Sequence, residues 1–397
     1  MSDSVRPYRV DVPRSDVERL LRRLKDTRIP TQDIVPNAGS DYGITTGWIN
    51  DMYNYWLNNF EWYKQQDYMN QWPHFLTEIN DQDVHFVHAR SKAPGALPLL
   101  LIHGWPGSFY EFSQVINPLT KPEDESKQAF HCIVPSLPGF CFSSRPPRGQ
   151  TLKHVAGMFH TLMQRLGYDK YCVQAGDWGQ WVGRELGANP TYAKHVTAIH
   201  FNWLPAPLPS DLAASSNPRD QQIHSRVQAW LTSHLAYAIH MRTRPSSLAL
   251  TLTDNPTALL SFIGEKYDEA VNPNNPLIKS NLWKGHILTT VCLYYFTNCA
   301  GTSSLVYFEN TWHERFPEEI VKKENRVRVP MGYTSFLWDT RPSVRWGAEQ
   351  TGNLVFYSER DEAGHFAALE CPEGLVEDIR AVVGMVTRGE VKTEEFD

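Results

Sequence analysis

The feature that most constrains the fold of this chain is a sharp turn between a short strand and a helix. Residues 173–175 favour a strand and lead into Gly176-Asp177-Trp178-Gly179, and a helix-like stretch follows over residues 180–187. Small residues on both sides of a central residue permit a strained turn that exposes the central side chain at the edge of a sheet. The sequence therefore predicts that Asp177 lies at the apex of a strand–turn–helix unit.

The residue at the apex is an aspartate, and its carboxylate limits the chemistry that the turn can support. A serine in this position suits acyl transfer at a carbonyl carbon and needs a base to activate it. A carboxylate is already ionised at neutral pH and can displace a leaving group from saturated carbon, which gives an alkyl ester on the protein. Asp177 therefore favours an enzyme that acts on epoxides or alkyl halides.

The segments around this turn alternate between strands and helices. Short, nearly all-apolar strands are predicted over residues 97–103, 130–135, 171–175 and 196–201, and a helix over 152–166. Strand patterns resume at residues 326–330 and 354–357, and a helix follows over 373–387. Apolar strands that alternate with helices are typical of an α/β fold with a mostly parallel sheet covered by helices.

The same patterns divide the chain into three parts. Residues 1–95 are rich in aromatic side chains and form an N-terminal extension, and residues 96–204 with 325–397 form the α/β core. Residues 205–324 are predicted to be helical and rich in loops. Because ligands bind at the carboxyl ends of the strands in open α/β sheets, we expect this inserted segment to be a lid over that edge.

Two helices and one strand are expected in the extension. Ser15-Asp16-Val17-Glu18 has the pattern of a capping box that opens a helix, and Pro30 ends that helix. A second helix is expected over residues 46–63, where apolar side chains recur at every fourth position and predict a buried face: Trp48, Met52, Trp56 and Phe60. Residues 84–88 alternate like a strand.

Composition limits the partners and the compartment. The chain has 397 residues and a formal net charge of −6, and it has no long basic run, which argues against a nucleic-acid partner. The N-terminal residues lack an apolar signal core, and no apolar run is long enough to span a membrane, so we expect no membrane anchor. Six scattered cysteines without a metal-binding spacing favour a reducing, cytoplasmic setting. The oligomeric state does not follow from the sequence, and a homodimer stays open.

Two further motifs lie where a nucleophile at residue 177 needs them. His103-Gly104-Trp105-Pro106-Gly107 directly follows the first strong strand. In α/β-hydrolases an N–H group of this loop and the N–H group after the nucleophile form the oxyanion hole, and here these belong to Trp105 and Trp178. Ala363-Gly364-His365-Phe366 follows the last strand, where a histidine can act as general base. These positions predict the α/β-hydrolase fold.

An acid that orients the histidine is expected after the preceding strand. Asp339 fits this position, whereas Glu359 and Asp361 are nearer to His365 in the sequence and are expected in a solvated loop. With Asp339, the chain order is nucleophile, acid, histidine, which is the order of the α/β-hydrolases. The joint occurrence of these motifs in that order carries the prediction.

These residues resemble the motifs of microsomal-type epoxide hydrolases, as in the soluble fungal and bacterial members of that α/β-hydrolase family. The resemblance covers nearly the whole chain and assigns the charge-relay acid to Asp339. The matching strings are Tyr42-Gly43 and Trp72-Pro73-His74-Phe75 in the extension, His103-Gly104-Trp105-Pro106-Gly107-Ser108, Gly176-Asp177-Trp178-Gly179, and Gly364-His365-Phe366-Ala367-Ala368-Leu369-Glu370, which is the most specific.

The resemblance also implies side chains that contact the substrate. Two lid tyrosines that hydrogen-bond the epoxide oxygen correspond to Tyr237 and Tyr307, and the residues alone do not single these two out among the 17 tyrosines. His103, Cys141 and Phe366 are further candidates for substrate contacts because they belong to loops at the same edge of the sheet. Cys141 stands where relatives often have glycine.

The implied reaction converts a small-molecule epoxide and water to a vicinal diol, through an ester on Asp177 that water activated by His365 hydrolyses. It requires neither a metal nor an organic cofactor. Two alternatives stay open. A haloalkane dehalogenase shares the aspartate and can bind halide through an indole such as that of Trp178, and a non-catalytic protein of this fold only binds a ligand. The tyrosine pair and the extension favour the epoxide.

Overall fold

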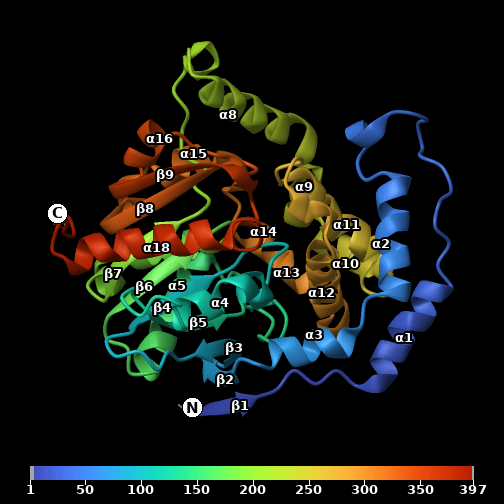
Figure 1. Ribbon diagram of the computed structural model, residues 1–397, viewed down its shortest axis with the longest axis horizontal. Helices are drawn as coiled ribbons and strands as arrows, with labels where there is room; N and C mark the ends of the chain where they lie inside the picture. The colour runs from blue at the N-terminus through green and yellow to red at the C-terminus, as the bar shows by residue number, and fades with distance from the viewer. Residues whose placement is uncertain (1–3, 396–397) are drawn as a thin grey trace.

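The computed structural model describes residues 4–395 and shows a central sheet with helices on both faces (Figure 1). The described residues form one nine-stranded sheet in the order β1-β2-β3-β5-β4-β6-β7-β8-β9. The five strand pairs from β5 to β9 are parallel, and the three pairs from β1 to β5 are antiparallel. The predicted α/β architecture with a mostly parallel sheet is confirmed.

The parallel strands coincide largely with the predicted ones. In spatial order they are β5 (Phe130–Pro135), β4 (Leu97–Ile102), β6 (Tyr171–Ala175), β7 (Val196–Phe201), β8 (Val327–Trp338) and β9 (Gly352–Gly364). The last two strands are longer than predicted, and they pair with each other as far as Trp338 and Gly364. The added part of β8 contains Gly332, Thr334 and Ser335, which interrupt the apolar run although they are buried.

The N-terminal extension contributes strands that the sequence did not predict. It adds β1 (Val5–Tyr8), β2 (His74–Ile79) and β3 (Gln82–Ala89) to the edge of the sheet, and of these only β3 was expected. Asn80 and Asp81 join β2 to β3 with φ values of 54° and 60°. Two successive residues with positive φ are typical of a tight hairpin turn, which places β2 directly beside β3.

The helices of the extension correct two expectations. α1 (Arg14–Lys25) begins after Pro13 without a side-chain cap, so the predicted capping box at Ser15 is wrong because that residue already lies in the first turn. The single helix expected over 46–63 is two helices, α2 (Thr46–Asn58) and α3 (Trp62–Met69). The predicted packing face is confirmed in part, since Met52 and Trp56 are buried.

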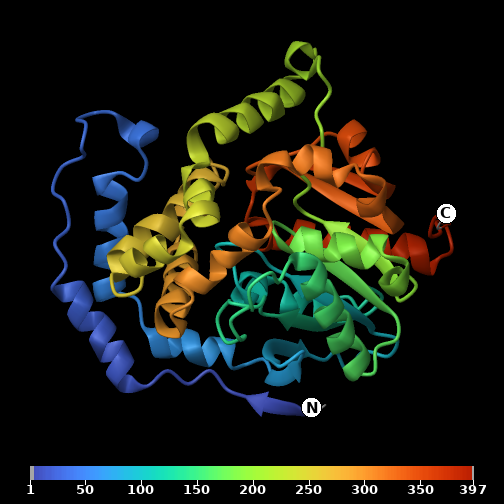
Figure 2. The same cartoon turned by 180° about the vertical axis from the view of Figure 1, so that it is seen from behind.

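The helices that flank the sheet hold it between two layers. α18 (Pro372–Thr387) packs against β7 and β8 on one face, and α5 (Leu152–Arg165) and α6 (Gly179–Ala188) lie on the other (Figures 1 and 2). Four shorter helices complete the core: α4 (Ile116–Thr120), α7 (Pro190–Ala193), α16 (Arg345–Glu349) and α17 (Ala367–Glu370).

All described residues between β7 and β8 are helix or loop, as the sequence predicted. The helices of this insertion are α8 (Pro218–Ala229), α9 (Ala236–Thr243), α10 (Pro245–Leu252), α11 (Pro256–Glu269), α12 (Asn281–Thr297), α13 (Ala300–Ser303), α14 (Leu305–Glu309) and α15 (Phe316–Ile320). They gather at the carboxyl edge of the sheet, and α11 and α12 also contact helices of the extension (Figure 2). No helix within residues 4–395 is long and apolar enough to cross a membrane.

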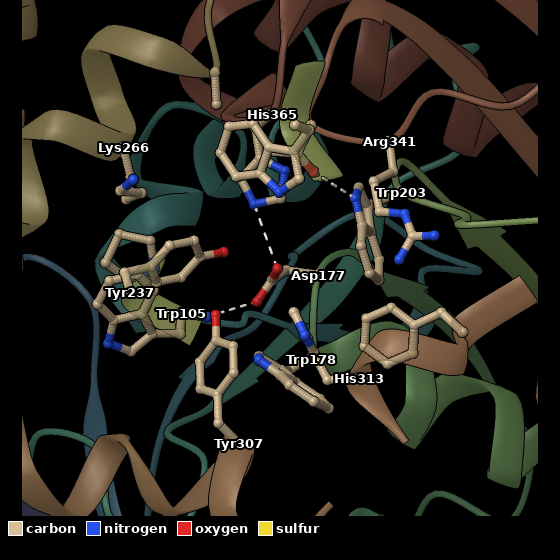
Figure 3. Close-up of a pocket in the computed structure, with 15 residues that line it drawn as sticks. Trp105, Asp177, Trp178, Trp203, Tyr237, Lys266, Tyr307, His313, Arg341 and His365 are labelled. Atoms are coloured by element: carbon tan, nitrogen blue, oxygen red, sulfur yellow. Dashed lines mark hydrogen bonds and ion pairs between the residues drawn. The ribbon is translucent and has the colours of Figure 1, made fainter. Parts of the chain in front are cut away.

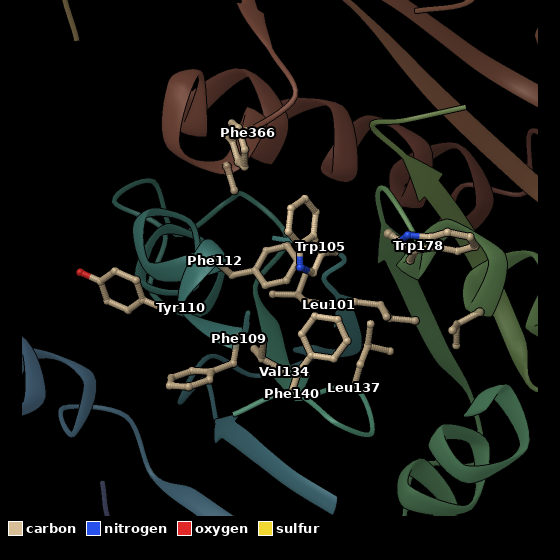
Figure 4. Packing of buried hydrophobic residues seen from close by; sticks show 14 of the residues in the cluster. Leu101, Trp105, Phe109, Tyr110, Phe112, Val134, Leu137, Phe140, Trp178 and Phe366 are labelled. Atoms are coloured by element: carbon tan, nitrogen blue, oxygen red, sulfur yellow. The ribbon is translucent and has the colours of Figure 1, made fainter. Parts of the chain in front are cut away.

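Apolar packing fixes the loop that follows β4. Leu101, Phe109, Phe112 and Phe140 are each no more than 2% exposed, and they fill the space beneath this loop (Figure 4). Interiors packed in this way leave little room for side-chain rearrangement. The loop therefore holds its backbone N–H groups in fixed positions at the sheet edge.

Candidate active site

The structure places Asp177 at the apex of the predicted turn. The residue follows β6, precedes α6 and has a φ of 44°, in the left-handed region that few residues other than glycine occupy. A Cβ atom at Gly104 would collide with the Asp177 carboxylate, and one at Gly179 would collide with the Ile102 carbonyl oxygen. Glycine at both positions is what allows the turn to approach the neighbouring loop so closely.

One oxygen of Asp177 is held by the main chain. The Trp105 N–H donates a hydrogen bond of 2.7 Å to Oδ1. The other oxygen, Oδ2, lies 3.5 Å from Nε2 of His365 (Figure 3). The carboxylate is thus fixed in orientation by one backbone donor and faces the predicted histidine with its other oxygen.

His365 in turn is oriented by Asp339. Its Nδ1 donates a hydrogen bond of 2.7 Å to Oδ1 of Asp339, which directly follows β8 and is 1% exposed. The N–H of Thr340 donates a further hydrogen bond of 2.6 Å to the same oxygen. The structure therefore brings together the three residues that the sequence proposed as nucleophile, acid and base.

The two carboxylates determine the charge of the histidine. Burial disfavours the imidazolium, but the negative charges and hydrogen bonds of Asp339 and Asp177 outweigh it and raise the pKa of His365 well above its usual value. His365 is therefore protonated at neutral pH while Asp177 carries its charge.

The alternative acids lie elsewhere. Glu359 and Asp361 belong to β9 rather than to the solvated loop that was expected, and Asp361 binds Arg219 at 2.7 Å. Glu359 accepts a hydrogen bond from Tyr357. Neither carboxylate is bonded to His365, because these β9 side chains point into a different ion-pair cluster.

The insertion places two tyrosines over Asp177. Tyr237 comes from α9, which follows a π-helical turn over Trp230–His234, and Tyr307 comes from α14. Their rings lie 5.9 Å apart at 79°, and both hydroxyl groups point toward the Asp177 carboxylate (Figure 3). The Trp105 ring stacks on Tyr237 at 5.1 Å. Tyrosines from distant helices thus meet above the predicted nucleophile.

Burial and the nearby Asp177 carboxylate affect both phenols in the same direction. Desolvation is the main cause that raises the pKa of Tyr237 and Tyr307 above the usual value, and the charge of Asp177 adds to it. Both hydroxyl groups therefore stay protonated at neutral and moderately basic pH, and both can donate a hydrogen bond.

A cavity surrounds these groups. Its aromatic walls include Trp178, Trp203, Trp230 and Phe316. The cavity also contains three charged or titratable side chains that the sequence did not single out: Lys266, His313 and Arg341. Lys266 and His313 come from the insertion, so no local motif connects them to Asp177. Arg341 could have been suspected from the sequence, because it lies two residues after Asp339.

Three predicted substrate contacts do not line this cavity, and the structure corrects them. The buried His103 joins two loops, since its Nδ1 donates to the Gly104 carbonyl oxygen and its Nε2 accepts from the Leu137 N–H. Desolvation lowers the pKa of His103 to about 4, so the ring is neutral. Phe366 stacks on Tyr267 with ring centroids 3.7 Å apart.

Cys141 is the third of these candidates. It is 8% exposed, has a φ of 45° and contacts Cys299 of the insertion. Its thiol therefore packs between core and insertion rather than at the cavity. Within residues 4–395, no group of three or more metal-ligating side chains is placed to hold a metal ion.

Comparison with known proteins agrees with this geometry. The family described as "Epoxide hydrolase N terminus" matches residues 5–112, and the family described as "alpha/beta hydrolase fold" matches residues 98–258. A Stigmatella aurantiaca protein named provisionally as an epoxide hydrolase is 32% identical to this chain, over 95% of this chain and 84% of that protein.

Two solved structures share the whole architecture. The Aspergillus niger epoxide hydrolase is 33% identical with a TM-score of 0.85, and the match covers 96% of this chain and 97% of that one. The juvenile hormone epoxide hydrolase of the silkworm Bombyx mori is 28% identical with a TM-score of 0.86, over 98% of this chain and 96% of that one. With its aspartate, histidine and tyrosines assembled at the sheet edge, the chain belongs to the epoxide hydrolase family of the α/β-hydrolase fold.

Proposed function

We propose that this protein hydrolyses an epoxide to a vicinal diol through a covalent ester on Asp177. The observation that carries the proposal is the position of the Asp177 carboxylate, which lies between His365 on one side and the hydroxyl groups of Tyr237 and Tyr307 on the other (Figure 3). A nucleophile, a base and two proton donors around one cavity are the groups that a two-step hydrolysis of an epoxide needs.

The first step is the attack of Asp177 on the less hindered epoxide carbon. A bond forms between a carboxylate oxygen and that carbon, and the ring C–O bond breaks. The leaving alkoxide is strongly basic and takes a proton from Tyr237 or Tyr307, which remain more acidic than an aliphatic alcohol. The product is a hydroxyalkyl ester of Asp177.

The second step follows from the charge that the first step removes. Once Asp177 is an ester, one of the two anions that raise the pKa of His365 is gone, so the imidazolium can release its proton, which replaces the proton that the tyrosine gave to the alkoxide, and can then act as a base. His365, held by Asp339, then takes a proton from water, and the hydroxide attacks the ester carbonyl carbon of Asp177. When the tetrahedral intermediate collapses, the proton of the added hydroxyl passes to the departing oxygen, so the diol leaves and the carboxylate is restored.

Backbone donors stabilise the tetrahedral intermediate of this second step. The Trp105 N–H already lies 2.7 Å from Oδ1 of Asp177, and the Trp178 N–H at the start of α6 is the second donor in our proposal. Fixed donors at the oxygen where negative charge develops are effective because they need no reorganisation. Both N–H groups are those that the sequence suggested for the oxyanion hole.

The origin of the two tyrosines indicates a role for each part of the chain. Because the insertion supplies both tyrosines, we propose residues 205–324 as the lid, residues 96–204 and 325–397 as the core, and residues 1–95 as a support for the lid.

Two rival functions fit the site less well. A dehalogenase requires an indole N–H open to halide, whereas the Trp178 indole lies against the hydroxyl of Tyr307. A purely binding function does not account for an assembled triad.

The origin of the diol oxygen tests the proposed function. In a single turnover with excess enzyme in ¹⁸O-water, we expect an unlabelled diol, because its new oxygen comes from Asp177 and water attacks the carbonyl carbon. Mass spectrometry should find the label in the peptide that contains Asp177. Labelled diol in the first turnover would show direct attack of water on the epoxide, and release of bromide from 1-bromobutane without diol from styrene oxide would favour a dehalogenase.

The tyrosine pair gives a second prediction. Loss of one positioned donor typically costs about 10²–10³-fold in rate. We expect Tyr237→Phe and Tyr307→Phe each to slow ester formation by up to this factor, because the remaining phenol compensates in part, and the double variant to be nearly inactive. Rapid-quench measurement of the ester is the test, with Tyr171→Phe as control for a buried tyrosine, bonded to His160, outside the cavity. Substantial activity in the double variant contradicts the assignment.

A further inference from the structure

Arg341 is a cation in the wall of the cavity that the reaction described above does not use. It follows Asp339 by two residues, lines the cavity and is 6% exposed. In Figure 3, Arg341 and the two tyrosines lie on opposite sides of Asp177. Arg341 thus occupies a position where the part of a substrate away from the tyrosines can reach it.

The guanidinium of Arg341 has no polar partner among the described residues. None of its nitrogens makes a hydrogen bond or ion pair there, and the centroid of the Phe316 ring lies 5.8 Å from the guanidinium carbon. Glu318 is near enough to affect its charge but makes no ion pair with it. Burial lowers the pKa of Arg341 to about 10, so the group is still charged at neutral pH.

Lys266, the other cation of the cavity, is paired with carboxylates, in contrast to Arg341. Its Nζ lies 2.7 Å from Glu265 and 2.6 Å from Glu269, and it also lies over the Tyr237 ring. Lys266 is therefore neutralised within the insertion. Of these two cations, Arg341 is the one whose charge no carboxylate balances.

An unpaired charge in such a place is costly for a folded protein. Arginine is rarely buried to this extent without a partner, because the loss of hydration is offset only by ion pairs and hydrogen bonds. Asp177 does not supply the missing anion, since its two oxygens face the Trp105 N–H and His365. The free donors of Arg341 are therefore available to a ligand.

We propose that Arg341 binds an anionic group of the substrate, and that the preferred substrates are epoxides that carry a carboxylate. This inference rests on the proposed epoxide hydrolysis and specifies its substrate class. The planar guanidinium has donors in a fixed fork that fits the two oxygens of a carboxylate. Trp203 and Phe316, which also line the cavity, provide apolar contacts for the hydrocarbon that connects the carboxylate to the epoxide.

A matched series of terminal epoxides tests the inference. The series contains epoxyhexanoate, epoxyoctanoate and epoxydecanoate, the methyl ester of each, and the epoxyalkanes of similar length. For at least one chain length, we expect kcat/KM of the wild-type protein to be about tenfold or more higher for the acid than for its ester. Truncating one partner of a buried charge pair weakens binding by about 30-fold or more, so Arg341→Met should remove the preference for the acid over its ester, mainly through KM.

Two further variants test whether the preference for the acid depends on the guanidinium group and on its position in the cavity. Arg341→Lys keeps the charge without the fork, so we expect an intermediate ratio. Arg345→Met removes an exposed arginine of α16 that is outside the cavity, and it should leave the ratio unchanged. Because Arg341 lacks a partner, Arg341→Met should keep or raise the melting temperature, whereas a fall would indicate a structural role and overturn the proposal.

Failure of the inference and failure of the proposed function give different results. If esters and alkanes are hydrolysed but no acid is preferred, or if Arg341→Met leaves the ratio unchanged, the carboxylate site is wrong and the epoxide hydrolysis stands. If no epoxide of any kind is hydrolysed, the proposed function is wrong. The site is then tested by equilibrium binding of octanoate and octanamide, read from the tryptophan fluorescence of the cavity: an Arg341-dependent preference for octanoate supports it, and equal binding overturns it.

Discussion

Replacement of Asp177 by asparagine is expected to reduce epoxide turnover by on the order of 10⁴-fold or more, as for other covalent nucleophiles. The amide is a very poor nucleophile toward saturated carbon, so the ester cannot form. The fold should persist, because asparagine has nearly the same shape and its Oδ1 can still accept the hydrogen bond from the Trp105 N–H. Steady-state diol formation by freshly purified protein, together with its melting temperature, is the measurement.

The control for this variant is Asp361→Asn, the same change at a carboxylate that the sequence left as a competitor for the acid. Asp361 pairs with Arg219 and its side chain is 63% exposed, so we expect its replacement to leave turnover within a few fold. Mass spectrometry of the Asp177→Asn protein must first exclude deamidation to aspartate. Near-wild-type turnover in a protein free of aspartate at this position would rule out Asp177 as the nucleophile.

The core of the fold could be predicted because its strands are buried on both faces. Strands β5 and β6 are nearly all apolar, interrupted only by His131 and Gln174, and their predicted bounds are those of the structure. The turn at Asp177 was recognisable for a local reason as well, since only small neighbours permit it. By contrast, β1 and β2 are partly exposed, and pairing across the sheet, which the sequence does not reveal, determines them.

Some residues of the site could be predicted from the order of the strands, and others could not. Asp339 and His365 follow strands whose ends meet at one edge of the sheet, so chain order alone points to them. Tyr237 and Tyr307 came from family resemblance, because their meeting over Asp177 depends on how the helices of the insertion fold back. Arg341 was not anticipated, since a burial that leaves a cation without a partner is a property of the packed structure and not of local sequence.

Cys141 was predicted to contact the substrate, but it does not line the cavity. Its position after a strand at the carboxyl edge suggested a place in the cavity, but the loop turns at this residue with a positive φ and brings the thiol against Cys299. The direction of a loop side chain depends on such backbone details, which neither composition nor periodicity reports.

Replacement of His365 by glutamine is expected to separate the two chemical steps. Asp177 needs no base for its attack, so ester formation should continue, whereas hydrolysis should be slowed by on the order of 10⁴-fold for want of a base. Mixing the variant with a good epoxide should give a stable adduct on the peptide that contains Asp177, detected by mass spectrometry. His240→Gln, a change at an exposed histidine of α9, should give no adduct beyond that of the wild-type protein.

The rate of ester hydrolysis by the wild-type protein should depend on pH, and the charges next to His365 determine the direction of that dependence. While Asp177 is ionised, the pKa of His365 is well above its usual value, and the ester lowers it by removing one anion. Hydrolysis of the ester requires neutral His365, so its rate should rise as the pH increases through the pKa that His365 has in the ester and then reach a plateau. In the His365→Gln variant this rise should vanish while the adduct forms. If the variant gives no adduct, or if the slow hydrolysis keeps the wild-type pH profile, His365 is not the base of the second step.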